Sequence, residues 1–480
     1  MTHVSSAWGD LLVKFSPMMT APTFENFVAL VLGWVLCLGR RTITRVALAG
    51  APWTGDKDFS VFPRFLSRAV WAVEKLTPAL VALVLPWLPP VVVVLVDDTL
   101  CRKGGPHLWG AGMHHDPLRS TYGRGRVVSF AFGHNWVVVS LWVPLPWNPA
   151  RGIAIPVAFR LYRQKKRCPP GEYRKRTDLA REALEQVQAC LPERRLHLVG
   201  DREYACHSLV QRLPNRVGFT GPMPMNAALY DKPKPSRGRG RPRVKGARLP
   251  TPAQMAADPR IPWQPVSPVL YGRQVPLLIK TCIALWYSAA GGRPGRVVVT
   301  RDPSGRIEDR AYFGTGSTLN EKTPLVEIEP PDASETLTGF SRRWAAEEMH
   351  RNTKQHLGLE DPQNGWWRRP SQTPAPRKTP GPQPHATRGA NAVNRTVPLI
   401  FVTYALVVLR YLAAGDPVAD VAKVRLRCPW RRLKREPSFG DMLASARRDL
   451  WASAIFAETR PDGASPKNPA DVLEWLLAAA

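Results

Sequence analysis

The stretch LTPALVALVLPWLPPVVVVLV at residues 76–96 places the strongest constraint on the fold. Its 21 residues are uncharged and mostly apolar, so the stretch is long enough to cross a bilayer. It also contains four prolines, two of them in tandem at Pro89 and Pro90, and a tandem pair would break a membrane helix. A buried helix over 79–88 followed by a buried valine-rich strand over 91–96 fits better. We therefore expect a core helix, a core strand and no membrane partner.

Strand and helix patterns alternate after this stretch. The sequence predicts strands and a helix in the order strand, strand, strand, helix, strand, at 91–99, 126–145, 154–163, 177–191 and 196–204. This order is typical of an α/β core with a mixed sheet. The ribonuclease-H-like fold begins in this way, and we expect that fold here.

The rest of the chain differs from this core in composition. Apolar spacings of three and four predict helices from residue 20 to 88, and an apolar helix at 393–413 contains Pro398 and Arg410, which favour burial in protein over a membrane. The expected organisation is a helical N-terminal, DNA-binding region at 1–90, a first core part at 91–213, a β-rich basic insertion at 214–335, a second core part at 336–413 with a proline-rich loop at 365–390, and a tail at 414–480.

The chain has 67 Lys and Arg residues against 38 Asp and Glu residues, a formal charge of +29. This excess indicates a polyanionic partner, most simply nucleic acid. A hydrophobic fraction of 44% and a charged fraction of 22% are ordinary for globular proteins and argue against wholesale disorder. The seven cysteines have no metal-ligand spacing, and the first residues lack a signal-peptide pattern. We expect free thiols and a cytoplasmic, nucleoid-associated protein.

Three acidic residues stand out because of their positions. Asp97 follows the most hydrophobic strand of the chain, and Asp201 follows the fourth strand in the same manner. Glu347 lies in the predicted helix 340–357, beside an apolar face. Three carboxylates that meet repel one another unless cations lie between them, and oxygen ligands suit Mg²⁺. Two such ions can activate a hydroxyl and stabilise a leaving oxygen in phosphodiester chemistry.

The sequence around these acids resembles the DDE transposases of bacterial insertion sequences. The similar segments are Asp97-Asp98-Thr99, Asp201-Arg202-Glu203-Tyr204, the run Phe340-x2-Arg343-x3-Glu347-x6-Lys354, and HLGLEDPQ at 356–363. Further segments similar to these transposases extend the resemblance to roughly residues 20–460. In the family, the glutamate helix reads Tyr-x2-Arg-x3-Glu-x6-Lys, so Phe340 departs from the pattern by lacking a hydroxyl.

The resemblance implies a function and a set of roles. Such enzymes bind the terminal inverted repeats of their element, nick the DNA by hydrolysis and join the freed 3′ end to target DNA. Asp97, Asp201 and Glu347 would hold two Mg²⁺ or Mn²⁺ ions, while Arg343 and Lys354 would contact phosphates. The enzyme would act as a homodimer on paired double-stranded DNA ends. The alternative is a catalytically inactive, DNA-binding remnant of a transposase, which Phe340 and the proline-rich loop favour.

Two choices among the acids stay open. Asp98 competes with Asp97 as the first ligand, and alternation along a strand points the two side chains to opposite faces. Glu348 competes with Glu347, although the seven-residue step to Lys354 counts from Glu347. The family position favours Asp97 and Glu347.

Basic and aromatic residues outside the core are further candidates. The insertion carries a run from 232 to 248 with eight cations and no acid, including the DNA-binding candidates Arg239, Arg241, Arg243 and Lys245. Arg239-Gly240-Arg241-Pro242 could enter a minor groove or contact phosphates without reading sequence. Three further sets are candidates that also have a simpler interpretation. Trp263 or Trp286 would be a platform for a flipped base or a core residue, and a basic turn with Arg40, Arg41 and Arg45 would contact DNA or be solvated. A metal cluster of His107, His114, His115 and Asp116 is more simply a polar loop.

Overall fold

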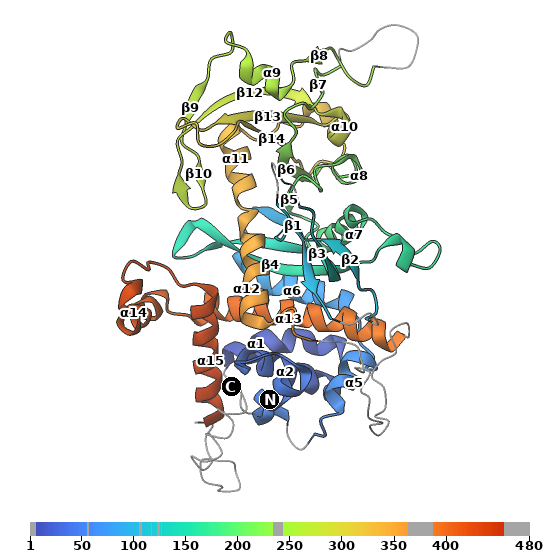
Figure 1. The fold of residues 1–480 in the computed structure, drawn as a ribbon, viewed down its shortest axis with the longest axis vertical. Helices are drawn as coiled ribbons and strands as arrows, with labels where there is room; N and C mark the ends of the chain where they lie inside the picture. The colour runs from blue at the N-terminus through green and yellow to red at the C-terminus, as the bar shows by residue number, and fades with distance from the viewer. Residues whose placement is uncertain are drawn as a thin grey trace.

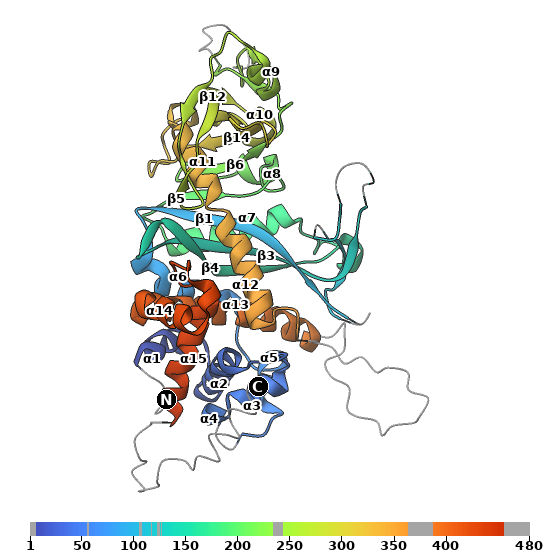
Figure 2. The same ribbon diagram turned by 60° about the vertical axis from the view of Figure 1, so that its left-hand side comes forward.

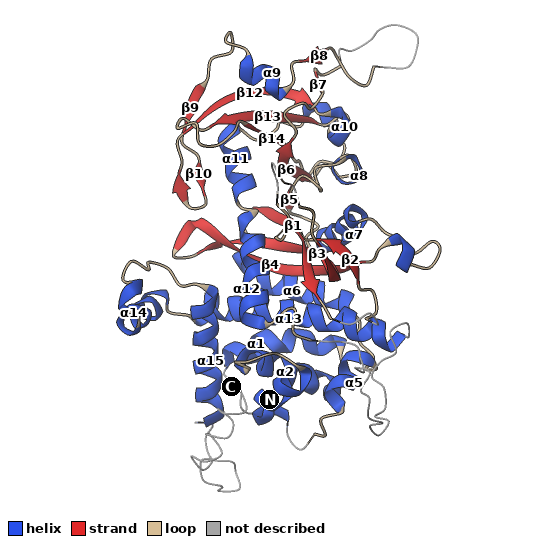
Figure 3. Ribbon diagram, viewed as in Figure 1, coloured by secondary structure: helices blue, strands red, loops and turns tan. Residues whose placement is uncertain are grey.

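A computed structural model describes residues 6–54, 57–104, 108–116, 118–121, 125, 127–233, 243–362 and 387–455. Figure 1 shows three tiers along the long axis: a helical layer at the bottom, the central strands in the middle, and the β-rich insertion at the top. Figure 3 shows the same division by type of element. The proline-rich loop predicted at 365–390 lies almost wholly outside the described residues.

The helical layer joins the two ends of the chain. Two helices of the second half of the chain, α13 (Thr387–Ala414) and α15 (Phe439–Ile455), pack against the N-terminal helices, as the turned view in Figure 2 also shows. The N-terminal helices in this contact are α1 (Ser6–Leu12), α2 (Ala21–Leu36) and α5 (Val61–Ser67). A Cβ on Gly33 of α2 would lie 2.1 Å from the Val46 carbonyl oxygen of α3, so only glycine allows this close approach. The helices predicted over residues 20–88 are confirmed as α2 (Ala21–Leu36), α3 (Ile43–Ala49), α4 (Ala51–Thr54), α5 (Val61–Ser67), η2 (Val73–Lys75), α6 (Leu76–Val84) and η3 (Leu85–Trp87). Two further helices, α1 (Ser6–Leu12) and η1 (Val13–Met18), precede them.

Helix α13 (Thr387–Ala414) is the central element of this layer. It is long and apolar enough to cross a membrane, but 83% of its most apolar window is buried inside the protein. Its buried Arg395 donates hydrogen bonds to the carbonyl oxygens of Leu66 and Trp71. Arg410 donates to Ser445 of α15 (Phe439–Ile455). The expected burial of this helix in protein is confirmed.

The stretch 76–96 forms the predicted helix and strand. Helix α6 ends at Val84, and strand β1 (Val91–Arg102) follows with Val92 to Val96 buried. The strand is longer than predicted, because its second half pairs with an antiparallel neighbour.

The core sheet combines antiparallel and parallel strands. β1 pairs antiparallel with β3 (Phe130–Leu145), and β3 pairs antiparallel with β4 (Asn148–Tyr162). On its other side β1 pairs parallel with β5 (Arg195–Val199), which pairs parallel with β6 (Val217–Met223). Helix α7 (Arg176–Cys190) packs on β3 and β4. The order β4-β3-β1-β5-β6 is consistent with a ribonuclease-H-like fold. β2 (Gly112–His115) pairs with β3, and η4 (Lys165–Arg167) follows β4.

The insertion continues the same sheet beyond β6. Its strands follow β6 in the order β14, β13, β12, β7, β8. Because β6 lies in the expected insertion and pairs with β5 of the core, hydrogen bonding runs across the boundary expected at residues 213 and 214. The strands β6 and β14 were not predicted. The elements of this region are α8 (His207–Val210), β7 (Leu229–Tyr230), β8 (Arg248–Leu249), α9 (Pro252–Ala257), β9 (Gln264–Val266), β10 (Val269–Leu270), β11 (Arg273–Gln274), β12 (Leu277–Leu285), α10 (Tyr287–Ala290), β13 (Pro294–Arg301), β14 (Arg310–Thr315) and η5 (Leu325–Glu327).

The predicted helix 340–357 is two helices, so that prediction was wrong. α11 (Ala333–Ser341) ends in a tight turn, and α12 (Trp344–Leu357) begins after it. The amide nitrogens of Arg343, Ala345 and Ala346 each bond the carbonyl oxygen three residues earlier, which winds the chain more tightly than an α-helix. Phe340 therefore lies on a different helix from Glu347. The tail contributes α14 (Pro417–Arg427) and η6 (Pro429–Arg431) before α15.

Candidate active site

The parallel strands β1 and β5 bring two acidic segments to one edge. Their pairing ends at Leu95 opposite Val199. Asp97 follows two residues later on β1, and Asp201 follows two residues after the end of β5. Asp97 is inside the strand and not at its end, because β3 continues to pair with β1. The end of the parallel pairing sets the position of the acids, and strand ends of this kind are where sites collect in α/β sheets.

Asp97 faces helix α12. Its Oδ2 lies 3.9 Å from Arg343 Nη1 and 4.0 Å from His350 Nε2. The side chain is only 13% exposed. Burial raises the pKa of Asp97 to about 8, and the nearby Asp98 and Asp201 carboxylates act in the same direction while Arg343 opposes them. This carboxyl group therefore holds a proton unless a further cation approaches.

Asp98 faces the opposite side of β1. Its Oδ2 accepts a hydrogen bond of 2.7 Å from Asn135 Nδ2 and lies 3.5 Å from Arg176 Nη1 at the start of α7. The same arginine pairs with Glu203. The expected alternation of the two aspartates is thus confirmed, and Asp97 is the one that faces the helix carrying Glu347.

Asp201 is close enough to feel the charges on both faces of β1, namely Asp98 on one face and Arg343 on the other. Its Oδ1 accepts the backbone N–H groups of Glu203 at 2.9 Å and Tyr204 at 3.3 Å, which fixes the turn after β5. Burial raises the pKa of Asp201, the negative charge of Asp98 adds to the rise, and Arg343 opposes it. Asp201 is therefore electrostatically coupled to groups on both faces of β1.

Glu347 lies in the first turn of α12, where the helix dipole favours a carboxylate. Its Oε1 accepts a close contact from Arg343 Nη2. Arg343 also approaches Asp97, so one guanidinium lies between two of the three predicted acids. In the structure this arginine neutralises carboxylates, whereas the sequence predicted that it contacts phosphate.

The carboxylate oxygens are donors of the type that suits a divalent metal ion, although an arginine lies between two of them. Among the described residues, no group of three acidic, histidine or cysteine side chains is close enough to hold a metal. The Arg343 cation occupies the space between Asp97 and Glu347 instead. Asp98 and Asp201 raise the pKa of Asp97, and an arginine is the nearest counter-charge. Carboxylate oxygens are hard donors of the type that binds Mg²⁺ or Mn²⁺.

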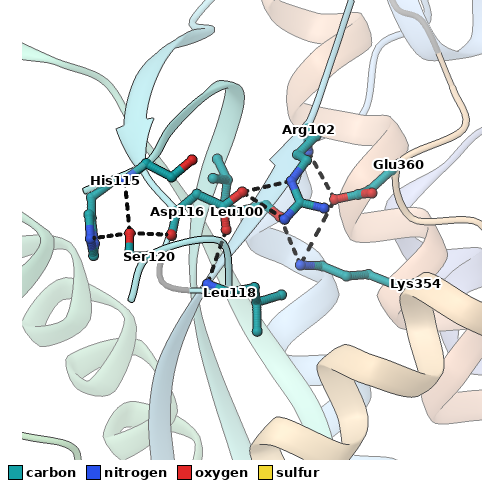
Figure 4. A network of polar contacts seen from close by, with 9 residues as sticks. Leu100, Arg102, His115, Asp116, Leu118, Ser120, Lys354 and Glu360 are labelled. Atoms are coloured by element: carbon teal, nitrogen blue, oxygen red, sulfur yellow. Dashed lines mark hydrogen bonds and ion pairs between the residues drawn. The ribbon is translucent and has the colours of Figure 1, made fainter. Parts of the chain in front are cut away.

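Lys354 lies one to two turns further along α12, at the end of β1. Its Nζ donates a 2.8 Å hydrogen bond to the Leu100 carbonyl oxygen and lies 3.9 Å from Glu360. Figure 4 shows this lysine in a polar network with Arg102, whose guanidinium binds Asp116. Lys354 thus bonds to protein groups here, and its predicted phosphate contact stays a prediction.

Phe340 packs inside the protein, where its ring centre lies 4.9 Å from that of Tyr312 on β14. The Arg343 guanidinium carbon lies 5.7 Å from the Phe340 ring. A tyrosine ring therefore lies beside Phe340, although it comes from the insertion. The pKa of Tyr312 is raised by burial and lowered in part by Arg310 and Arg343.

The other predicted DNA contacts are only partly described. Arg239 and Arg241 lie outside the described residues. Arg243 is exposed, and the Nζ of the exposed Lys245 lies 4.0 Å from the Tyr230 ring centre. Arg41 is buried and donates to the carbonyl oxygens of Cys37 and Gly39, so it is not a DNA contact in this structure.

The structure places the candidate base-stacking tryptophans and the histidine-rich cluster in different environments. Trp286 is buried against Phe313, so it offers no open face to a base. Trp263 lies between Lys280 and Arg301, whose cations are 4.7 and 4.2 Å from its ring centre. His107 lies outside the described residues. Its predicted partners are engaged elsewhere: His114 packs on Tyr162, His115 bonds Ser120, and Asp116 pairs with Arg102. The seven cysteines, all within described ranges, are free.

Three side chains of the site were not predicted. Asn135 and Arg176 bind Asp98, and the buried His350 approaches Asp97 with both ring nitrogens lacking a hydrogen bond within the described chain. His350 follows Glu347 by three residues, so helical spacing could have placed it on the same face. No local pattern points to Asn135 or Arg176, because they meet Asp98 through sheet pairing and the position of α7.

Carboxylates from separate segments of the chain that meet around metal ions are used by enzymes that cut phosphodiester bonds. A family model described as "DDE superfamily endonuclease" matches residues 14–267, just over half of the chain. The chain belongs to this family, as the resemblance to DDE-type transposases predicted. The matched range includes Asp97 and Asp201, and Glu347 lies beyond it. A comparison with curated proteins found no match.

Proposed function

We propose that the protein is a DNA transposase. It binds the terminal inverted repeats of an insertion sequence, nicks the DNA by metal-dependent hydrolysis and joins the freed 3′ end to target DNA. The observation that carries this proposal is the Arg343 guanidinium between Asp97 and Glu347, beside Asp201, because it marks a carboxylate site that needs a cation. The family match supports the endonuclease activity.

The ligands proposed for two Mg²⁺ or Mn²⁺ ions are Asp97, Asp201 and Glu347. Bound ions would activate the attacking hydroxyl and stabilise the leaving oxygen. Each carboxylate has a defined support: β1 fixes Asp97, the backbone amides of Glu203 and Tyr204 hold Asp201, and the first turn of α12 presents Glu347. Asp97 would lose its proton on binding the ions, because their positive charge would offset the burial and the neighbouring carboxylates that raise its pKa.

Arg343 has two proposed roles. It offsets the negative charge of the carboxylates in the metal-free protein. When metal ions offset this charge instead, its side chain would turn to contact a DNA phosphate. Its place in the tight turn between α11 and α12 supports this exchange, since only its side chain has to reorient. Lys354 would contact a phosphate further along the same helix. We also propose that two copies act together on paired DNA ends.

The test uses double-stranded DNA that contains the gene and its flanking sequence. The full chain with Mg²⁺ should produce 3′-hydroxyl ends at inverted repeats and join them to a second duplex. Asp201→Asn should reduce nicking by roughly 10³-fold or more, because it removes one carboxylate charge from the metal site. Its DNA affinity should change little.

The matched control is Glu193→Gln, which removes one exposed carboxylate outside the site. This variant should nick like the parent. DNA binding without nicking by the parent protein would support the inactive-remnant alternative. Nicking that survives in Asp201→Asn would refute the assignment of the site.

A further inference from the structure

The tail carries an exposed basic surface beside the active-site helix. We define the tail surface as Arg427, Arg431, Arg432 and Arg435 together with the exposed Trp430 and Leu433. Trp430 is 79% exposed and Leu433 is 82% exposed. Figure 1 shows α14 standing out to the left of α15, at the level of α13 and below the central strands.

The four guanidinium groups of the tail surface have no partner among the described residues, although acidic residues are near in sequence. Those acids are engaged elsewhere. Asp420 binds Arg448 and Tyr411, Asp441 binds Lys434 at 2.6 Å, and Glu436 binds Arg151 at 2.7 Å. The positive charge of the tail surface is therefore not neutralised by the protein itself.

The tail surface adjoins a cavity of about 1000 Å³. Leu433 and Arg435 form one wall, and the N-terminal end of α12 with Trp344 and Glu348 forms another. The insertion hairpin β10–β11 closes a third side with Tyr271 and Arg273. The rings of Tyr271 and Trp344 lie 6.2 Å apart, and both are exposed.

The cavity lies beside the turn of α12 that carries Glu347. Glu348 lines it, and Glu347 is the neighbouring residue on the same helical turn. The Arg151–Glu436 pair lines the same cavity and ties the tail to the first residues of β4. This link holds the tail surface at a fixed place relative to α12.

We propose that the tail surface binds the phosphate backbone of duplex DNA and, with the cavity, forms a track for the strand that leaves the active site. This inference rests on the proposed function, in which the substrate is DNA. Arginine forks suit phosphate oxygens, and several uncompensated arginines in one place favour a polyanion over a small anion.

Charge decides between DNA and a second copy of the chain. A symmetric contact would place each tail surface against the same surface of its partner, so four arginines would face four arginines. The chain as a whole carries +29, which adds to this repulsion. DNA has the opposite charge and can pass along the open side of the surface.

The test compares two quadruple variants that lose the same charge. The tail variant is Arg427→Gln, Arg431→Gln, Arg432→Gln and Arg435→Gln. The control replaces four exposed cations on other elements by glutamine, namely Lys14, Lys75, Arg195 and Arg212. Affinity for a random-sequence duplex is measured for the full chain over a series of salt concentrations. Each lost phosphate contact lowers the slope of log affinity against log salt by about 0.9.

The tail variant should lower this slope by about 3 to 4 units, and the control by less than about 1 unit. Equal slopes for the two variants would overturn the proposal while leaving the proposed function intact. A parent protein that does not bind duplex DNA would contradict the proposed function as well. Two double variants keep the test decisive if the quadruple variant aggregates, namely Arg427→Gln with Arg431→Gln, and Arg432→Gln with Arg435→Gln. Each double variant should lower the slope by about half as much as the quadruple variant.

Two further outcomes would also overturn the proposal. One is binding of the parent to phosphatidylserine vesicles that the tail variant alone loses, with an unchanged DNA slope. The other is a change from dimer to monomer in sedimentation for the tail variant alone, again with an unchanged slope. These results would assign the surface to a membrane or to a second copy.

Discussion

Arg343 and the acids around it determine the electrostatics of the site. The arginine contacts both Asp97 and Glu347, and its own pKa is raised by these carboxylates although burial acts against it. A charge-assisted contact of this kind contributes about 1.5–3 kcal/mol. In the metal-free protein, Arg343 therefore competes directly with a metal ion for the same oxygens.

Replacing Arg343 by glutamine should have opposite effects on stability and on metal binding. The metal-free protein should lose about 1.5–3 kcal/mol, because the Glu347 carboxylate loses its charge-assisted contact with Arg343. Mn²⁺ should bind roughly tenfold more tightly, because it no longer has to displace the arginine. This corresponds to a binding free energy that is more favourable by about 1.4 kcal/mol. Thermal unfolding with and without Mn²⁺ measures both effects, since a ligand of the folded state raises the melting temperature.

The matched control for this measurement is Arg351→Gln. Arg351 is on the same helix, is 53% exposed and pairs with Glu348. It should change stability by less than about 0.5 kcal/mol. Weaker Mn²⁺ binding in Arg343→Gln would show that the arginine supports the metal site instead of competing with it.

At the scale of elements, strand β3 carries a buried titratable group. His134 is 1% exposed, and its ring Nε2 lies 2.8 Å from the Trp109 carbonyl oxygen. Burial lowers the pKa of His134 to about 4, and the nearby Lys103 and His114 lower it further. The unfolded chain takes up a proton below about pH 6.5, whereas the folded chain does so only near pH 4.

His134 should therefore stabilise the fold above pH 6.5, and this contribution should be lost as the pH falls towards 4. The loss is at most about 1.4 kcal/mol per pH unit. His134→Gln keeps an N–H donor for Trp109 and does not titrate, so its melting temperature should fall less steeply over this range. Parallel curves for the parent and the variant would mean that His134 takes up its proton equally in both states.

The sequence predicted elements best where a single pattern dominates. The valine run of β1, the apolar spacing of α13 and the helix α7 follow from local patterns of burial. β6 and β14 were missed because their places depend on pairing between distant segments. The break before Trp344 was missed because apolar spacing continues across the tight turn at Arg343.

For the site, the sequence supplied residue types and order but not contacts. Asp97 and Asp201 follow adjacent parallel strands, so their approach could be expected from the sheet alone. The Arg343 contact with Asp97 depends on how α12 lies across β1, and residue spacing along the chain does not contain that information. The same holds for Asn135 and Arg176 beside Asp98.

At the scale of the whole molecule, α13 connects the helical layer to the sheet. Arg395 binds two backbone carbonyls, and its guanidinium carbon lies 4.9 Å from the Trp71 ring centre. Arg395→Met should keep the volume but leave both carbonyls unpaired, at a cost of about 2–4 kcal/mol. Urea denaturation measures this loss. Arg388→Met, at an exposed position of the same helix, should cost less than about 0.5 kcal/mol, and equal losses would contradict the proposed role of Arg395.

The central claim is that Asp97, Asp201 and Glu347, from three separate parts of the chain, share one metal site. Iron-directed cleavage tests this claim without knowledge of the DNA sequence. Fe²⁺ bound in place of Mg²⁺ generates radicals with ascorbate and peroxide, and these cut the backbone near the metal. The account predicts cuts close to residues 97, 201 and 347 that excess Mg²⁺ suppresses and that Asp201→Asn loses. Cuts confined to the region of His114 and His115, or to one of the three acidic segments alone, would contradict it.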